Sequence, residues 1–417
     1  MNLDLIEDLY VFLGIFLVVI ILLVFSLKKH LYSIFDFWIF IILNQAIIVS
    51  VFMYLYYTEV VGFDVFINII LSIIFFIFGL NTFYKKIDVF NFKNEILIER
   101  TIYLLTFFIV SFYIINTLIS IYLLGIPFIT GTRRTISVYS QMGSGFGIVY
   151  YLNWGLSLLM TVLIAKLYLL KKQRLSYRIL FIFMLCLILN TGSRLVYLEL
   201  FLFFIYAIHL SNINFTFKIL PKFVRLALYL LPFIVMLSFI SAVEAGYESN
   251  VFLAFTKRLI GTAEGPFYYF VGGSEKYITN LNIFKYHFAH ILPYFGIPTN
   301  DEINLGVNIT ELSSFSFGKK GFGPNPTFYV IGNIIFGKFS FIYAFIMGSF
   351  MSFVRYGLTY IGFSLYFLLN ITAVAIIADG TLFSMSLFYV LIILIPLSYL
   401  MLLGYKPKET MNKNLNK

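Results

Sequence analysis

The chain of 417 residues contains little charge and almost no cysteine. Only 12% of its residues are charged, 61% are hydrophobic and the mean hydropathy is +0.95. A soluble domain needs much more charged surface than this. Cys186 is the single cysteine and lies within an apolar run, which excludes a disulfide framework and a cysteine metal site. These absences indicate a membrane protein.

The apolar residues gather in runs of about twenty, the length at which a helix crosses the hydrocarbon core of a bilayer. The sequence therefore predicts an all-α polytopic integral membrane protein, a single membrane domain over 1–417 with about 11 transmembrane helices. The first run follows the acidic stretch MNLDLIEDL, so no cleavable signal peptide is expected. The predicted spans are 9–27, 31–57, 65–84, 101–124, 147–170, 179–191, 195–210, 226–243, 338–354, 357–378 and 381–404.

Basic residues follow every odd-numbered predicted span. They are Lys28 and Lys29; Lys85, Lys86, Lys93 and Arg100; Lys171, Lys172, Arg174 and Arg178; Lys218, Lys222 and Arg225; Arg355; and those of the tail, 405–417. The positive-inside rule places these loops and the C-terminus in the cytoplasm and the N-terminus outside. The same bias explains the net charge of +10, so nucleic acid is not an expected partner.

Three segments on the predicted outer face are more than simple turns: the Arg/Gly loop 125–146, the polar stretch NTGSR at 190–194, and the long, partly membrane-associated loop 244–337. They carry cations that the positive-inside rule disfavours on that face, namely Arg133, Arg134, Arg194, Lys257 and Arg258. A guanidinium group matches the geometry of a phosphate or diphosphate. For Arg194 and for the Lys257–Arg258 pair, two interpretations stay open, an anchor to lipid headgroups or an anion-binding site.

The long loop also supplies candidate bases. His287 and His290, three residues apart in KYHFAHILPYFG, share a helix face, and either a general base or a structural role is open for them. No third metal ligand is evident, so no metal is predicted. Glu264 is a third candidate base, and Asp301, Glu302 and Glu311 are rivals.

Two further features of these segments bear on the predicted site. Glu199 lies five residues after Arg194 and either pairs with a cation of another span or is protonated. The stretch GKKGFGPNPTFYVIGNIIFGK is predicted to dip into the membrane, which is tolerable only where it lines a protein cavity.

Together, the many spans, the external arginine loop, the TGSR hairpin and the one large late loop resemble the Wzy O-antigen and capsule repeat-unit polymerases. The stretch GFGPNPTFYVIGNIIFGKFSFIYAFIMG is similar in character to the close of that loop in those proteins. Arg134 and Gly145 match an arginine, ten residues, glycine spacing of some members. No counterpart begins at Arg258, so the two-loop transfer mechanism of such members is not supported here. The resemblance covers about residues 100 to 400.

The resemblance implies a GT-C-like glycosyltransferase, without a cofactor, on the outer face of the bacterial cytoplasmic membrane. It would polymerise undecaprenyl-diphosphate-linked oligosaccharide repeat units, with membrane lipids, a chain-length regulator and a flippase as further partners. Its arginines would stabilise the diphosphate leaving group while a base takes the acceptor proton. The candidate catalytic residues are Arg194, Arg134, Arg133, Arg258, His287, His290 and Glu264, and the candidate substrate-binding residues are Lys257, Glu199, Tyr268 and Asn325.

Three other functions remain open on the sequence. An O-antigen ligase shares the topology and the lipid-linked donor but uses a different acceptor. A flippase or transporter of lipid-linked oligosaccharide is the non-enzyme alternative, although the sequence shows no internal repeat and its polar residues gather on one face. A membrane protein with an external binding loop is the third.

Overall fold

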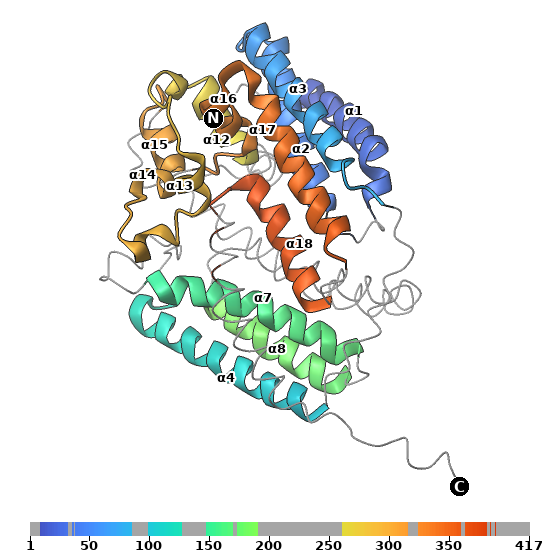
Figure 1. The fold of residues 1–417 in the computed structure, drawn as a ribbon, viewed down its shortest axis with the longest axis vertical. Helices are drawn as coiled ribbons and strands as arrows, with labels where there is room; N and C mark the ends of the chain where they lie inside the picture. Colours follow the sequence, from blue (N-terminus) through green and yellow to red (C-terminus); the bar gives the residue numbers. More distant parts are fainter. Residues whose placement is uncertain are drawn as a thin grey trace. The chain divides into compact units, whose positions relative to one another are not determined.

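The computed structural model describes residues 9–31, 36, 38–85, 99–126, 147–169, 173–190, 261–315, 324–359, 363–381, 384 and 388. All regular secondary structure in these residues is helical (Figure 1). The helical stretches there that are long and apolar enough to cross a membrane are Tyr10–His30, Ile39–Tyr57, Phe63–Leu80, Thr106–Leu124 and Phe328–Gly357. This confirms the predicted all-α class with helices of membrane-crossing length.

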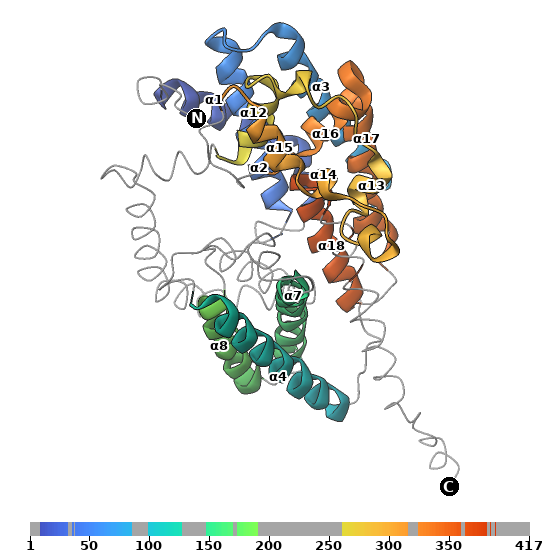
Figure 2. The same ribbon diagram turned by 90° about the vertical axis from the view of Figure 1, so that its left-hand side faces the viewer.

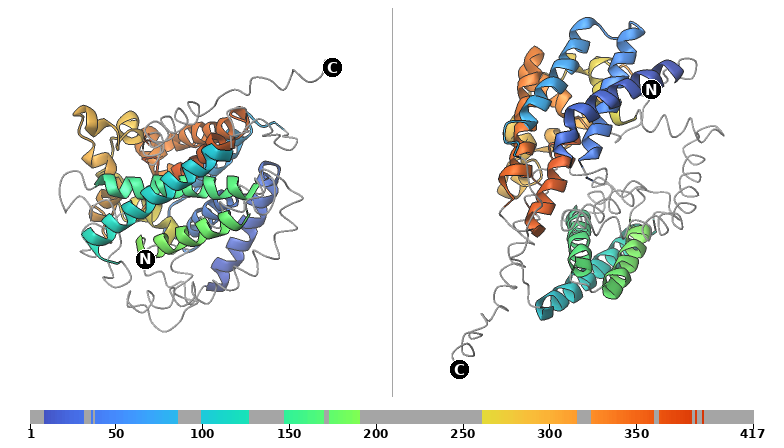
Figure 3. Two further views of the ribbon diagram at one scale, coloured as in Figure 1. Left: turned by 90° about the horizontal axis from the view of Figure 1, so that it is seen from below. Right: turned by 90° about the vertical axis from the view of Figure 1, so that its right-hand side faces the viewer.

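The described residues divide into two compact units. The first lies within Met1–Asn91 and Thr191–Ser384, and the second within Phe92–Asn190 and Met385–Lys417. Among its described residues, the second unit contains three helices that pack on one another, α4 (Glu99–Leu124), α7 (Gly147–Leu169) and α8 (Gln173–Asn190) (Figures 2 and 3).

A hydrogen bond and an aromatic contact join the helices of the second unit. Asn153 of α7 donates a hydrogen bond of 2.7 Å to the hydroxyl of Ser120 on α4. Tyr113 of α4 packs against Phe183 of α8, with ring centroids 5.4 Å apart. Among apolar helices, such side-chain hydrogen bonds between neighbours fix which faces meet, because a buried polar group without a partner is costly.

In the part of it that the structure describes, the first unit contains five longer helices and several short ones. The longer helices are α1 (Leu9–Leu27), α2 (Ile39–Tyr57), α3 (Phe63–Leu80), α17 (Ser340–Ser352) and α18 (Phe363–Ala378). The short α-helices are α12 (Glu264–Phe270), α13 (Ile283–His287), α14 (Asn300–Ile303), α15 (Leu305–Glu311) and α16 (Phe328–Phe336). Single turns complete the unit: η1 (Lys28–His30), η2 (Gly261–Ala263), η3 (Ser274–Lys276), η4 (Leu292–Phe295), η5 (Gly337–Phe339) and the π-helical η6 (Phe353–Gly357).

Helices α3 and α17 lie side by side in Figure 1 and cross with their backbones in direct contact. A Cβ atom at Gly79 would lie 2.3 Å from the carbonyl oxygen of Phe345, and one at Gly348 would lie 2.2 Å from that of Phe76. Only glycine fits at these two positions. Such small-residue contacts let apolar helices approach closely enough to gain packing energy.

Further along the same interface, the α3–α17 contact is polar. The hydroxyl of Ser340 donates to Asn68 Oδ1 at 2.5 Å and lies 2.9 Å from the hydroxyl of Ser72. At the far end of α17, the hydroxyl of Ser352 donates to the carbonyl of Leu80 at 2.7 Å. These bonds fix the register of α17 on α3 over its whole length.

We distinguish two ends of the first unit, one at each end of α17. At the first, which we call the His30 end, η1 meets the last residues of α3 and α17. His30 lies 3.2 Å from Asn81 Oδ1 and 2.8 Å from the Tyr356 hydroxyl. At the other, the His287 end, α17 begins and α18 finishes, and His287 contacts Tyr343 and Gly380 there. Because α17 runs from one end to the other, the two groups of residues are separated by the length of that helix.

Helix α16 is the first arm of a hairpin with α17. Gly332 of α16 packs against the first turn of α17. The hydroxyl of Tyr329 donates to Gln45 Oε1 at 2.5 Å. Gln45 lies six residues into α2, about 9 Å along its axis. The apolar stretch Phe328–Gly357 therefore consists of the short helix α16, which begins inside the bundle, followed by α17 and the π-helical turn η6.

Several predicted boundaries differ from the observed ones. The span predicted at 31–57 begins at Ile39, because Asp36 accepts a hydrogen bond of 3.1 Å from the Trp38 backbone and so competes with a helical turn. Similarly, α18 begins at Phe363 rather than 357. Within the loop predicted over 244–337, the stretch predicted to dip into the membrane contains α16, which packs against α2. The predicted spans 195–210 and 226–243, and nearly all of 381–404, lie outside the described residues.

The α3–α17 contact leads to the first prediction. Replacement Gly348→Ala places a Cβ against backbone atoms of α3, which cannot withdraw as a side chain can, and we expect a loss of about 1–3 kcal/mol of stability. Thermal unfolding of the purified protein in detergent measures this. The matched control is Gly14→Ala in α1, where a Cβ meets nothing within 4 Å. Equal melting temperatures for the two variants would contradict the close crossing.

Candidate functional site

The sequence-predicted site residues are only partly within the described residues. Arg133, Arg134, Arg194, Glu199, Lys257 and Arg258 lie outside them. His287, His290, Glu264, Tyr268 and Asn325 lie inside. The structure therefore bears on the predicted bases and on part of the predicted substrate contacts.

Glu264 and Asn325 lie on two segments that pack closely on each other. Glu264 is the first residue of α12 and is half-buried. Its neighbour Gly265 packs so tightly on the chain before α16 that an added Cβ would lie 2.2 Å from the carbonyl of Asn325. The side chain of Asn325 is exposed, whereas that of Tyr268 is only 7% exposed and belongs to the core.

A separate group of residues, which we call the His287 cluster, joins α13 to the end of α18. Asn282 caps α13 by accepting a hydrogen bond from the backbone of Lys285, which places His287 at the last residue of the helix. His287 Nδ1 lies 3.2 Å from the carbonyl oxygen of Gly380, and His287 Nε2 lies 3.0 Å from the hydroxyl of Tyr343. The cluster thus ties the loop segment to both α17 and α18.

These two contacts fix the protonation of the imidazole. A carbonyl oxygen only accepts hydrogen bonds, so Nδ1 of His287 carries the proton and donates to Gly380. In the neutral ring Nε2 is then an acceptor, and the Tyr343 hydroxyl donates to it. The side chain of Tyr343 is only 1% exposed, so the basic nitrogen of His287 faces the protein interior.

The cluster also contains a carboxylate that the sequence analysis did not single out. Asp379 follows α18 directly, and its Oδ1 accepts hydrogen bonds from the Tyr286 hydroxyl (3.3 Å), the Thr381 backbone (2.9 Å) and the Thr381 hydroxyl (2.7 Å). The Tyr286 hydroxyl in turn accepts from the Gly380 backbone at 3.1 Å. The one signal in the sequence is the polar break Asp379–Gly380 after a long apolar run.

His290 completes the cluster. Its backbone donates to the hydroxyl of Ser384 at 3.3 Å. Burial lowers the pKa of His290 from 6.5 to about 4, although the negative charge of Asp379 opposes this. Burial likewise lowers the pKa of His287, partly offset by the Gly380 carbonyl and Asp379. Both imidazoles are therefore neutral at pH 7. Burial and the charge of Asp379 also raise the pKa of Tyr286, so its hydroxyl stays protonated.

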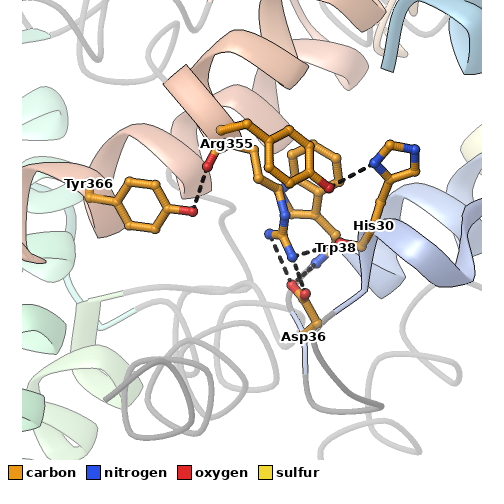
Figure 4. Close-up of polar contacts among 6 residues, drawn as sticks. His30, Asp36, Trp38, Arg355 and Tyr366 are labelled. Carbon is orange, nitrogen blue, oxygen red and sulfur yellow. Dashed lines mark hydrogen bonds and ion pairs between the residues drawn. The ribbon is translucent and has the colours of Figure 1, made fainter. Parts of the chain in front are cut away.

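A buried ion pair at the His30 end was also missed. Figure 4 shows the guanidinium of Arg355 directed at the carboxylate of Asp36, and both side chains are 0% exposed. Arg355 Nη1 lies 3.3 Å from Asp36 Oδ1, Arg355 Nη2 also bonds Asp36 Oδ2, and the guanidinium lies 4.3 Å over the ring of Trp38. The sequence analysis places Arg355 among the exposed basic residues of a cytoplasmic loop, and this prediction is wrong because the side chain is buried. The π-helical turn η6 carries the side chain into the protein instead.

The backbone around this pair is bound as well. Arg355 Nη2 donates to the carbonyl of His30 at 2.8 Å, and the hydroxyl of Tyr366 donates to the carbonyl of Arg355 at 2.9 Å (Figure 4). The pair therefore joins η1, the segment before α2, η6 and α18. Charges inside apolar helix bundles are expensive and are retained for a structural or functional reason.

The described part of the chain defines an all-helical protein with apolar helices of membrane-crossing length and a polar cluster at one end of a bundle. No protein-family model, no curated protein and no solved structure matches the chain. Within the described residues, no group of three or more His, Cys, Asp or Glu side chains is placed to hold a metal ion.

The buried pair leads to the second prediction. Replacement Asp36→Asn leaves a buried guanidinium without its counter-charge, and we expect it to lower stability by about 3–5 kcal/mol. The double variant Asp36→Leu with Arg355→Met removes both charges and should be more stable than either single variant. Thermal unfolding in detergent of Asp36→Asn, of Asp36→Leu, of Arg355→Met and of the double variant measures this.

The chain offers a matched control for this experiment. Lys338 and Asp64 form an ion pair of 4.0 Å with both side chains more than four-fifths exposed. Replacement Lys338→Met should leave the melting temperature unchanged, because exposed pairs contribute little. Additive losses in the Asp36/Arg355 double variant would show that the two side chains do not act as a pair.

The buried histidines lead to the third prediction. An unfolded chain takes up protons on imidazole near pH 6.5, whereas folded His290 does so only near pH 4. The unfolded state therefore binds more protons in this range, and stability falls as the pH drops from 7 towards 4. Replacement His290→Gln should reduce this loss, as melting temperatures at pH 7 and pH 5 will show. Replacement Lys285→Gln on the same segment is the control and should leave the pH dependence of stability unchanged. The same pH dependence in His290→Gln as in the unaltered protein would contradict the lowered pKa of His290.

Proposed function

We propose that this protein is a membrane glycosyltransferase that polymerises undecaprenyl-diphosphate-linked oligosaccharide repeat units into O-antigen or capsular polysaccharide. The observation that carries the proposal is the position of the His287 cluster at the opposite end of α17 from His30. Lys28, Lys29 and Lys85 gather at the His30 end. By the positive-inside rule, that end is cytoplasmic and the His287 cluster faces the outer leaflet.

The chemistry of the cluster supports this function. Transfer of a sugar from a diphosphate needs hydrogen-bonding groups for the acceptor hydroxyl and a base for its proton. The His287 cluster offers imidazole, carboxylate and hydroxyl groups within one polar region. The leaving diphosphate needs positive charge, and for this we propose the four arginines Arg133, Arg134, Arg194 and Arg258. The resemblance to Wzy-type polymerases, which carry external arginines, points to the same reaction.

A second candidate function is transport of a lipid-linked oligosaccharide, and helix α16 favours it. This helix begins beside Gln45 inside the bundle and ends at the His287 end. Helices that begin within the membrane are typical of substrate sites in secondary transporters. An O-antigen ligase, which uses the same donor, is the third candidate, and one experiment separates all three.

The fourth prediction concerns a bacterial strain from which this protein is deleted. Loss of a polymerase leaves single repeat units attached to the lipid acceptor. Loss of a ligase leaves polymer unattached, and loss of a flippase traps single units on the inner side. We expect the first pattern. Gel analysis of the cell-surface polysaccharide and of the carrier-linked pool distinguishes the three outcomes, and either of the other two patterns would replace the proposed function.

The same strain tests the arginines. Replacement Arg194→Ala removes one contact to the leaving diphosphate and should lower polymer formation about a hundredfold or more. Replacement Arg194→Lys should also impair it, because lysine lacks the planar fork of donors. The matched control is Arg178→Ala, an exposed arginine of α8. Full-length polymer from both Arg194 variants at normal protein levels would exclude an essential role for this residue.

A further inference from the structure

Within the His287 cluster, the side chains of His287 and Asp379 differ in what a substrate can reach. The proton acceptor of His287, Nε2, is already bonded to Tyr343, whose side chain is 1% exposed. The other nitrogen donates to the Gly380 carbonyl. For His287 to take a proton from a sugar, the ring must first break away from α17. Its contacts instead hold the segment after α18 against the start of α17.

Asp379 has the opposite arrangement. All three of its hydrogen bonds to described residues end on Oδ1, and they come from the Tyr286 hydroxyl and from the backbone and hydroxyl of Thr381. No donor in the described part of the chain reaches Oδ2. The side chain is half-buried rather than enclosed. One oxygen therefore fixes the carboxylate, and the other is left to receive a hydrogen bond from outside.

The donors on Oδ1 are themselves held rigidly. Tyr286 is 0% exposed and its hydroxyl also accepts from the backbone of Gly380, which prevents the ring from turning away. Thr381 is 4% exposed. A carboxylate oriented by buried partners needs little reorganisation when a substrate arrives, which is the condition for an efficient catalytic group.

We propose that Asp379 is the base that accepts the proton of the acceptor sugar hydroxyl, and that Tyr286, Thr381 and His287 are positioning residues. This inference rests on the proposed polymerase function. In the transfer, the acceptor oxygen forms a bond to the anomeric carbon of the donor as the bond from that carbon to the diphosphate oxygen breaks. The electron pair of the broken bond leaves with the diphosphate, and the hydroxyl proton ends on Asp379 Oδ2.

The fifth prediction tests Asp379 with purified protein in detergent and lipid-linked repeat units as donor and acceptor. Replacement Asp379→Asn keeps the shape and an acceptor oxygen at Oδ1 but removes the base, so kcat should fall about 10²–10⁴-fold while KM changes little. Replacement Asp379→Glu keeps a carboxylate and should retain more activity than Asp379→Asn. The matched control is Asp64→Asn, a carboxylate of α3 in the same unit whose side chain is 85% exposed, and this variant should behave as the unaltered protein.

A second readout separates a base from a structural carboxylate. Replacement Asp379→Ala opens space for a small carboxylate, and added formate should restore part of the turnover, whereas chloride at the same concentration should not. A purely structural role predicts lowered melting temperatures without rescue by formate. Melting temperatures of all variants are measured first, and if Asp379→Asn does not fold, Asp379→Glu and the formate experiment decide.

The outcomes distinguish the inference from the function on which it rests. If the unaltered protein forms no polymer from lipid-linked repeat units, the proposed function fails and the role of Asp379 fails with it. If the unaltered protein polymerises and Asp379→Asn does so at the same kcat, only the assignment of the base is overturned. Loss of kcat in Asp379→Asn with rescue of Asp379→Ala by formate supports both.

Discussion

The structure of the first unit depends on one buried ion pair, Arg355 with Asp36. Two charges without contact to solvent are costly unless each has the other as a close partner. Here Asp36 binds the guanidinium through both oxygens, and the His30 carbonyl takes a further donor. The pair therefore determines how η1, the segment before α2 and the end of α17 are joined. Because α17 is one continuous helix on α3, fixing its end also fixes its beginning.

That beginning is where the candidate site lies. The contact of Gly79 with Gly348 and the hydrogen bond from Ser340 to Asn68 hold α17 in one register on α3. Tyr343 is one turn further along α17, so its hydroxyl is held at a fixed place for His287. The packing of apolar helices thus sets the geometry of a polar cluster to which they contribute only one hydroxyl.

For α1 and α3, the sequence predicts the helix well, whereas it does not predict which distant side chains meet. The apolar runs give α1 at 9–27 without error and α3 within a few residues, because run length and hydropathy are local properties. Arg355 and Asp36 are 319 residues apart, and no local pattern reveals that they meet. His287 was identified as a histidine in an apolar setting, but its tautomer depends on the carbonyl of Gly380, 93 residues away. Asp379 reads in the sequence as the first residue of a loop.

Asp36 and Asp379 lie in different electrostatic environments. Asp36 is fully buried and binds the guanidinium of Arg355 through both of its oxygens. Among the described residues, Asp379 receives hydrogen bonds from neutral donors on Oδ1, and the nearby imidazoles are uncharged. In the proposed transfer, the leaving diphosphate needs cations beside it, as Asp36 has, whereas the group that takes the hydroxyl proton needs an oxygen that no cation binds. The proposed reaction therefore calls for two different electrostatic environments.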